Sequence, residues 1–166
     1  SILKSQSPKH RFKLEVLDMF EVMDMTGHNT FNPYGVSIME LYHGSRNCNM
    51  LGIMQSGLKV KPSAAVHTGS MFGAGIYFAS QSSKSANYCW GFGAANQALN
   101  SNFLLVCEVA TGKIKEYTDA QCDLRSAPRG YNSVMGKKST SLLHDEYIVY
   151  HSNQAKIKYI AEINIV

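Results

Sequence analysis

The chain has 166 residues, of which 45% are hydrophobic and 17% charged, and its formal net charge is +4. This length and apolar content predict one compact domain with a hydrophobic core and exclude a disordered chain. No apolar run approaches the roughly 18 residues of a membrane span, and the weak, evenly spread positive charge does not by itself indicate nucleic-acid binding.

The four cysteines are interpreted as reduced thiols inside the cell. None of them forms a CxxC pair, and a domain of this size does not need disulfides for stability. A zinc site would require clustered Cys and His ligands, which the sequence lacks, so no metal is expected. Because the N-terminus has no apolar signal segment, we expect an intracellular protein, in the nucleus or the cytoplasm.

Strand-like patterns run through most of the chain. Phe12, Leu14 and Val16 alternate with charged residues. The phase then slips at Leu17, which predicts a bulged strand. Alternating apolar residues from 157 to 165 predict a half-buried strand at the C-terminus. Further strands are expected at four short apolar runs, at residues 37–43, 76–79, 103–109 and 146–151.

Only two short helices are expected. One would begin at an Asn47 cap and end at Gly57, and the other would begin at a cap supplied by Ser82 or Ser83. Many strands with few helices predict an α+β domain with packed sheets. A Rossmann fold is excluded because no GxGxxG motif opens a helix after a strand.

The remaining segments are expected to be irregular. Residues 59–69 and 127–140 are rich in glycine, proline and polar residues, which predicts loops. The basic residues gathered between positions 4 and 13 predict a solvated, partly mobile tail.

Three residues are candidates for chemistry, each with a plain structural alternative. His43 is expected at the end of a strand, and Gly44 after it would let a ligand approach the backbone, although a simple turn explains both. Tyr77 offers an aromatic face to a cationic or π-system ligand, or it is a core aromatic. Glu146 opens an apolar strand, where a partly desolvated carboxylate can stabilise positive charge, or it is a surface acid.

Taken together, these residues resemble the His-Tyr-Glu signature of the poly(ADP-ribose) polymerase branch of the ADP-ribosyltransferase superfamily. The similarity extends through HGSRNCNMLGI, TGSMFGAGIYFA, SKSANYC and TSLLHDEYIVY and covers residues 42–166. It implies two packed, mostly antiparallel β-sheets with a few short helices around an NAD⁺ cleft. It also implies a single catalytic domain over residues 1–166, without the helical regulatory domain that many relatives carry.

The resemblance implies a nicotinamide subsite. The backbone of Gly44 and the hydroxyl of Ser85 would hold the carboxamide, and the ring would stack between Tyr77 and Tyr88. These contacts would orient the substrate for reaction.

The resemblance also implies how the rest of the substrate is held. His43 would contact the adenosine ribose, with Ser45 and Asn49 nearby. Glu146 would hold the 2′-hydroxyl of the nicotinamide ribose and stabilise the oxocarbenium-like ribose, and Lys84 would line the site. The catalytic set is therefore expected to be Glu146, His43 and Tyr77, with no metal.

The implied function is transfer of ADP-ribose from NAD⁺, which is consumed as a substrate, to protein side chains. Because Glu146 is retained, growing ADP-ribose chains are expected as further acceptors, whereas neither nucleic acid nor a membrane is implied. Two alternatives stay open, a mono-ADP-ribosyltransferase and a catalytically silent module that binds NAD⁺ or ADP-ribose. The segment between Gly112 and Glu146 looks short for a polymerase, which leaves the acceptor open.

Overall fold

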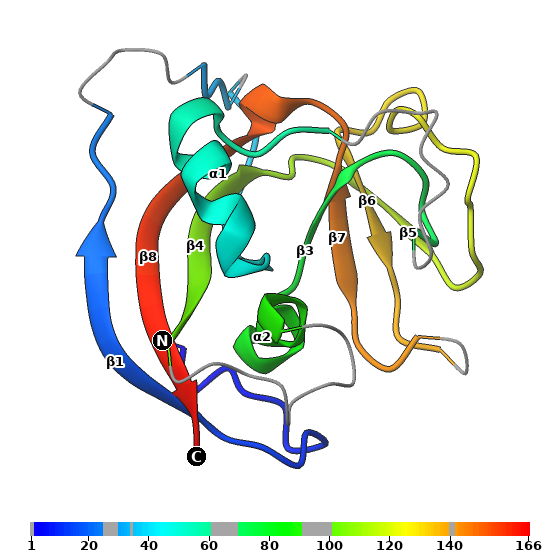
Figure 1. The fold of residues 1–166 in the computed structure, drawn as a ribbon. Helices are drawn as coiled ribbons and strands as arrows, with labels where there is room; N and C mark the ends of the chain where they lie inside the picture. Colours follow the sequence, from blue (N-terminus) through cyan, green and yellow to red (C-terminus); the bar gives the residue numbers. More distant parts are fainter. Residues whose placement is uncertain (1, 25–29, 34, 61–69, 91–100, 140–141) are drawn as a thin grey trace.

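The computed structural model describes residues 2–24, 30–33, 35–60, 70–90, 101–139 and 142–166 (Figure 1). Within these residues the strands form two four-stranded sheets, and two α-helices lie beside them. The predicted α+β class with two packed, mostly antiparallel sheets is confirmed. Among the described residues, no helix is both long and apolar enough to cross a membrane.

The first sheet is antiparallel throughout, in the order β1-β8-β4-β2. The register of β1 against β8 shifts between Val16 and Asp18, so the bulge predicted at Leu17 is confirmed. Its strands are β1 (Leu14–Glu21), β2 (Ile38–Gly44), β4 (Asn102–Ala110) and β8 (Ala155–Ile165).

The second sheet has the order β3-β7-β6-β5, in which only β5 and β6 run parallel. The two sheets meet where Tyr42 of β2 exchanges backbone hydrogen bonds of 2.9 and 3.0 Å with Ala79. The strands of this sheet are β3 (Ile76–Phe78), β5 (Ile114–Tyr117), β6 (Ser133–Gly136) and β7 (Glu146–Val149).

The predicted loop at residues 127–140 was wrong, because it contains β6. All four residues of β6 are buried between β5 and β7, so the strand lacks the alternation that marks a half-buried strand. Gly136, which we interpreted as a breaker, lies where the ring of Phe72 occupies the place of a Cβ. β5 was not predicted at all.

The helices are α1 (Met50–Ser56) and α2 (Ser82–Trp90), with short 3₁₀ turns at Asn47–Asn49 and Ser152–Gln154. Asn47 caps neither α1 nor its preceding turn, because its side chain donates to the Ser101 carbonyl at 3.0 Å. The predicted end at Gly57 is confirmed, where φ is +72°. This left-handed conformation favours glycine.

The expected mobile N-terminal tail was also wrong. Ile2 and Ser7 are buried against α2. Ser82 Oγ donates to the Ile2 carbonyl at 2.6 Å, and the Ser7 N–H donates to Ser83 Oγ at 2.7 Å. The serines that we expected to cap α2 therefore bind the N-terminal segment instead.

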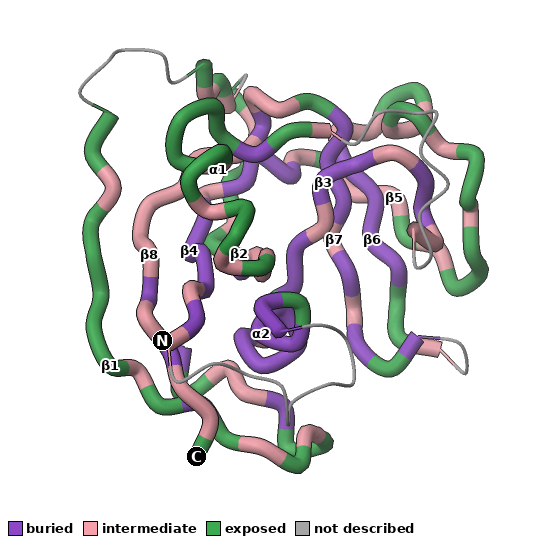
Figure 2. The backbone as a smooth tube through the Cα atoms, viewed as in Figure 1, coloured by how far each residue is buried: buried purple, intermediate pink, exposed green. Residues whose placement is uncertain are grey.

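Burial is uneven across the fold. Figure 2 shows the backbone of β4, β6 and α2 mostly buried and that of β1 mostly exposed. Cys107 is fully buried within β4, as its apolar surroundings predicted. The rigid inner strands and α2 thus form the frame on which the site is built.

Candidate active site

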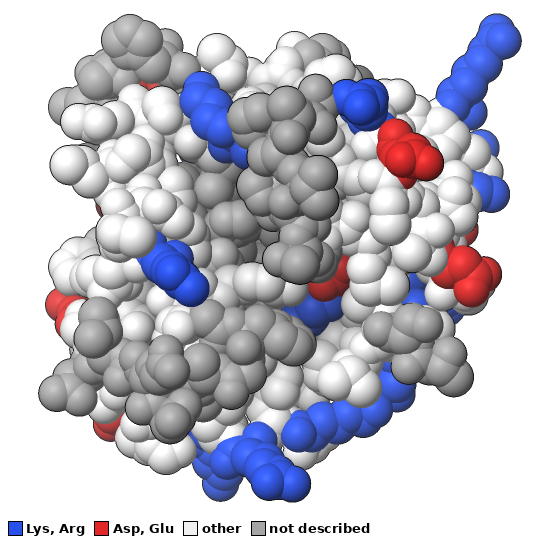
Figure 3. Space-filling model, turned by 45° about the vertical axis from the view of Figure 1, so that its right-hand side comes forward, with Lys and Arg blue, Asp and Glu red and all other residues white. Residues whose placement is uncertain are grey.

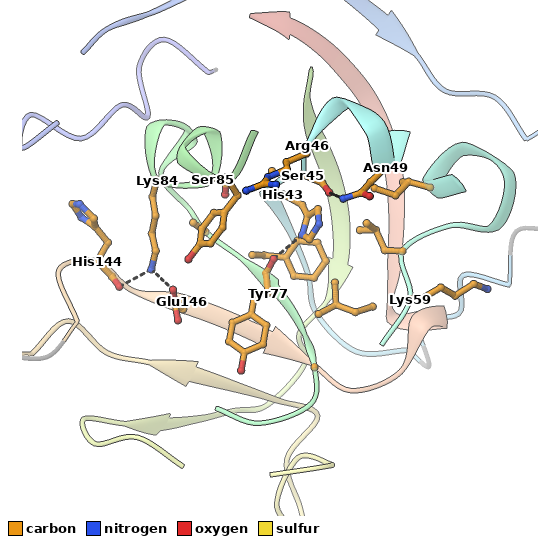
Figure 4. A pocket seen from close by; sticks show the side chains of 18 of the residues that line it. His43, Ser45, Arg46, Asn49, Lys59, Tyr77, Lys84, Ser85, His144 and Glu146 are labelled. Atoms are coloured by element: carbon orange, nitrogen blue, oxygen red, sulfur yellow. Dashed lines mark hydrogen bonds and ion pairs between the residues drawn. The ribbon is translucent and has the colours of Figure 1, made fainter. Parts of the chain in front are cut away.

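A cleft of about 1180 Å³ lies between the ends of the two sheets, bordered by α1 and α2. This volume is sufficient for a dinucleotide-sized ligand. Figure 4 shows side chains from α1, α2, β2, β3 and β7 facing this space. Every site residue predicted from the sequence lines it, namely His43, Gly44, Ser45, Asn49, Tyr77, Lys84, Ser85, Tyr88 and Glu146.

Glu146, the first residue of β7, is a buried carboxylate and not a surface acid. The residue is only 6% exposed, and its Oε1 lies 2.9 Å from Lys84 Nζ on α2. Its other oxygen, Oε2, is buried and has no hydrogen-bond partner among the described residues. An unsatisfied buried carboxylate oxygen is costly unless a ligand group reaches it.

Lys84 bonds to three acceptors at this end of the cleft. Besides the Glu146 carboxylate, its amine donates to the carbonyls of His144 at 3.0 Å and Asp145 at 3.3 Å. Burial lowers the pKa of Lys84, while the negative charge of Glu146 acts in the opposite direction. The opposite charges of Lys84 and Glu146 therefore offset part of the cost of burying each of them.

Tyr77 combines the two roles considered from the sequence, since it contacts a core cluster and also lines the cleft. Its hydroxyl accepts from the Phe72 N–H at 3.1 Å and donates to the Gly73 carbonyl at 2.7 Å. Burial, with a smaller contribution from Glu146, raises the pKa of Tyr77 to about 12. The phenol therefore stays protonated and holds the turn that precedes β3.

Tyr88 projects from α2 and is 42% exposed, the most open aromatic residue predicted for the site. Partial burial of its phenol and the charge of Glu146 raise its pKa to about 12. The phenol of Tyr88 therefore stays protonated at neutral pH.

The backbone around His43 is held from two sides. Because a carbonyl can only accept, His43 Nδ1 carries the proton in its 2.8 Å hydrogen bond to the Tyr77 carbonyl. The backbone groups of Gly44 share a strand edge with those of Tyr42, which bond to Ala79, so they point away from β4. At this edge the backbone of Gly44 borders the cleft.

Gly44 is required by close packing as well. A Cβ at this position would overlap the Ser85 carbonyl of α2, so only glycine lets α2 approach β2. The Ser85 hydroxyl donates to the Tyr42 carbonyl at 2.8 Å and retains its acceptor capacity. At the start of α1, Asn49 Nδ2 donates to Ser45 Oγ at 3.0 Å (Figure 4).

Sequence reasoning missed two histidines beside Glu146. The imidazoles of His10 and His144 lie with ring centroids 5.0 Å apart, and both residues line the cleft. His10 Nδ1 is 2.7 Å from Ser83 Oγ, which fixes the N-terminal segment against α2. No local signal identifies His10, because its surroundings are assembled from distant parts of the chain.

His144 is buried, and its Nε2 has no hydrogen-bond partner within the described part of the chain. Burial, followed by the positive charges of His10 and Lys84 and then of Lys9 and Lys138, lowers its pKa to about 4. Burial and Lys84 also lower the pKa of His10. At neutral pH the His144 ring is therefore uncharged, and the charged form of His10 is disfavoured.

The described residues contain no group of three or more His, Cys, Asp and Glu side chains that could hold a metal ion. Basic side chains occur at several separate places on the face shown in Figure 3. Glu146 is the only carboxylate that lines the described part of the cleft.

Comparisons with known proteins agree with this geometry. A family model described as the poly(ADP-ribose) polymerase catalytic domain matches residues 1–143. Poly [ADP-ribose] polymerase 2-A of Oryza sativa subsp. japonica is 33% identical over 184 residues, covering 92% of this chain and 27% of the relative. Poly [ADP-ribose] polymerase 2 of Homo sapiens is 33% identical over 191 residues, covering 96% and 32%.

The chain therefore belongs to the poly(ADP-ribose) polymerase catalytic-domain family, a family of ADP-ribosyltransferases whose substrate is NAD⁺. This confirms the family resemblance inferred from the sequence. The chain spans less than a third of the length of these relatives.

The alignments with these relatives are longer than the 166 residues of this chain, so the relatives carry additional residues inside the matched region. The expectation that the segment between Gly112 and Glu146 is short stays a prediction. Glu146 itself lies three residues beyond the end of the segment that the family model matches.

Proposed function

We propose that residues 1–166 act as one catalytic unit that cleaves the nicotinamide–ribose bond of NAD⁺ and transfers ADP-ribose to protein side chains. The observation that supports this most is the state of Glu146. One carboxylate oxygen is held by Lys84, and the other is buried in the cleft without a partner among the described residues. A ribose hydroxyl that donates to Oε2 would satisfy it.

The reaction follows from this arrangement. As the bond between C1′ and the ring nitrogen breaks, its electron pair moves to the positively charged nicotinamide, which leaves as a neutral molecule. The ribose becomes oxocarbenium-like, and the negative charge of Glu146 stabilises it. An acceptor hydroxyl then bonds to C1′ and gives up its proton, for which the Glu146 carboxylate that lines the cleft can act as the base.

The nicotinamide end would be oriented by α2 and β2 together. The backbone of Gly44 and the hydroxyl of Ser85 suit the carboxamide, which both donates and accepts. The rings of Tyr77 and Tyr88 suit a cationic aromatic ring that stacks between them. His43, Ser45 and Asn49 would contact the adenosine ribose.

Growing ADP-ribose chains are our proposed second acceptor. The Lys138 N–H donates to Asp145 Oδ1 at 2.7 Å, next to Glu146, and the charges of Lys9 and Lys138 act on His144. Their positive charge suits the pyrophosphate of an ADP-ribose unit that has already been transferred. Single transfer is the second candidate, favoured by the residues that this chain lacks relative to the polymerases it matches.

A purified-protein assay separates these functions. The chain is incubated with NAD⁺ labelled in the adenylate, nicotinamide release is measured, and the products are resolved on a gel beside Glu146→Gln. We expect a ladder of products that this variant loses. A single sharp band would favour mono-transfer, and binding without nicotinamide release would favour a silent NAD⁺ or ADP-ribose module. Within the cell, we propose action in the nucleus or the cytoplasm, with no nucleic-acid or membrane partner and no metal.

A further inference from the structure

His10 lines the cleft, although it belongs to the N-terminal segment and the proposed mechanism gives it no part. The residue is half-buried, and its imidazole stacks on the Phe12 ring with the centroids 5.2 Å apart. Both ring nitrogens contact side chains of α2. The ring centroid also lies 5.0 Å from that of His144, two residues before Glu146. His10 therefore contacts both α2 and the stretch of chain that leads into β7.

The contacts with α2 define the tautomer of His10. An amide nitrogen can only donate, so the 3.4 Å contact of Asn87 Nδ2 leaves His10 Nε2 as the acceptor. Nδ1 then carries the proton and donates to Ser83 Oγ at 2.7 Å. The same oxygen accepts the Ser7 N–H at 2.7 Å. The ring is therefore anchored, in a defined orientation, to the residue directly before Lys84.

The ion pair of Lys84 depends on how α2 and the start of β7 are held together. All three acceptors of the Lys84 amine lie within residues 144–146, so this side chain joins the first turn of α2 to the start of β7 (Figure 4). A lysine side chain is long and has many rotamers. Lys84 alone therefore leaves the position of Glu146 relative to α2 loosely defined.

His10 supplies a second link between the same two elements. It bonds to Ser83, the neighbour of Lys84, and its ring packs against His144, whose carbonyl accepts from Lys84 at 3.0 Å. Two links at neighbouring residues restrict the movement of one element past the other. This restriction matters for the reaction, since a shift of about 1 Å in the active site can lower the rate by roughly 10²-fold.

We infer that His10 is a positioning residue that holds the Lys84–Glu146 ion pair in its reactive geometry. It does so by joining Ser83 of α2 to His144. This inference rests on the proposed function of the cleft. It gives the N-terminal segment a part in the reaction, through contacts that lie outside the catalytic set.

Ser82 provides the matched control, because it fastens the same N-terminal segment to α2. Its hydroxyl donates to the Ile2 carbonyl at 2.6 Å and its N–H to the Ser5 carbonyl at 3.2 Å. Within the described chain, neither bond reaches residues 144–146. Ser82→Ala therefore loosens the segment and leaves the link through His10 in place.

His10→Ala tests the inference through nicotinamide release, measured at a temperature at which circular dichroism shows each variant folded. We expect kcat to fall by roughly 10- to 100-fold. The KM for NAD⁺ should stay within about twofold, because lost positioning acts on the transition state. Ser82→Ala should lower the melting temperature and leave kcat unchanged.

A second variant, Ser83→Ala, removes the anchor of the ring and keeps His10. Alanine is the best helix former, so this variant tests the inference even if His10→Ala does not fold. It should lower kcat in the same way. The double variant His10→Ala/Ser83→Ala should lower kcat little further, because both changes break one link.

The inference is overturned if kcat of His10→Ala stays within about twofold of the unmodified chain, or if Ser82→Ala lowers kcat equally. A rise in KM alone, or additive losses in the double variant, would overturn it as well. Failure of the proposed function differs, because the unmodified chain then releases no nicotinamide. In that case, amide hydrogen exchange at residues 144–147 still tests the link. His10→Ala should speed this exchange more than Ser82→Ala does, and equal exchange in the two variants would contradict the inference.

Discussion

The two ends of the cleft differ in burial and charge. At the end that holds Glu146, the groups are charged and buried, and Lys84 contacts three acceptors within 3.3 Å. At the end formed by α1, no residue of the helix is buried. Burial strengthens electrostatic interactions and fixes geometry, which chemistry requires. An exposed helix surface can contact a ligand while contributing little to folding.

This contrast predicts that substitutions at the two ends affect folding stability differently. Substitutions at the Glu146 end should cost folding free energy together with activity, because buried charges depend on their partners. Substitutions on α1 should change binding and leave the fold intact. The following experiments test this difference between the two ends of the cleft.

The largest effect on stability is expected for Lys84→Met, which leaves the Glu146 carboxylate buried without its cation. Removal of one partner from a buried pair typically costs about 3–5 kcal/mol of folding free energy. Urea unfolding of this variant and of the double variant Lys84→Met/Glu146→Gln measures it. The double variant should recover much of the loss, and purely additive losses would contradict a coupled pair.

A smaller effect is expected for Tyr77→Phe, which keeps the ring and removes the hydroxyl. The Phe72 N–H and the Gly73 carbonyl each lose a partner, which should cost about 1–3 kcal/mol of folding free energy. The ring itself remains, so the dissociation constant of nicotinamide should change little. If the variant keeps full stability, the hydroxyl does not hold the turn before β3.

A pH dependence of stability set by His144 is also expected. Its folded pKa of about 4 lies below the ordinary value of 6.5, so the unfolded chain binds more protons between these values. Stability is therefore fully present above about pH 6.5 and is lost as the pH falls toward 4, by at most about 1.4 kcal/mol per pH unit for one proton. His10 acts with the same sign.

Thermal unfolding between pH 4 and pH 7.5 measures this slope for the unmodified chain and for His144→Gln. The variant should show a shallower loss of stability toward low pH, and what remains belongs to His10 and other groups. An unchanged slope would mean that His144 titrates normally.

Local patterns predicted much of the scaffold. The phase slip at Leu17 and the regular alternation from Ile157 to Ile165 reflect side chains that face one buried and one open side. β6 escaped this reasoning because it is buried on both sides and contains Gly136. Fully buried short strands lack the periodicity on which such predictions depend.

The features of the site also fall into two groups, those that local sequence predicts and those that depend on contacts between distant residues. The segments around His43, Tyr77 and Glu146 were identified from the sequence because each keeps its signature within a few residues. The ion pair of Lys84 with Glu146 and the contact of His10 with His144 join residues far apart in the chain. Such contacts arise from the packing of α2 and the N-terminal segment, which no local pattern encodes.

The central claim is that Oε2 of Glu146 receives the 2′-hydroxyl of the nicotinamide ribose. The most direct test compares NAD⁺ with its analogue that lacks this hydroxyl, in the unmodified chain and in Glu146→Gln. Nicotinamide release is measured relative to the uncatalysed rate of each compound. The analogue should lower kcat/KM of the unmodified chain by roughly 10²–10⁴-fold and that of Glu146→Gln little further. Equal losses in both proteins would contradict the assignment.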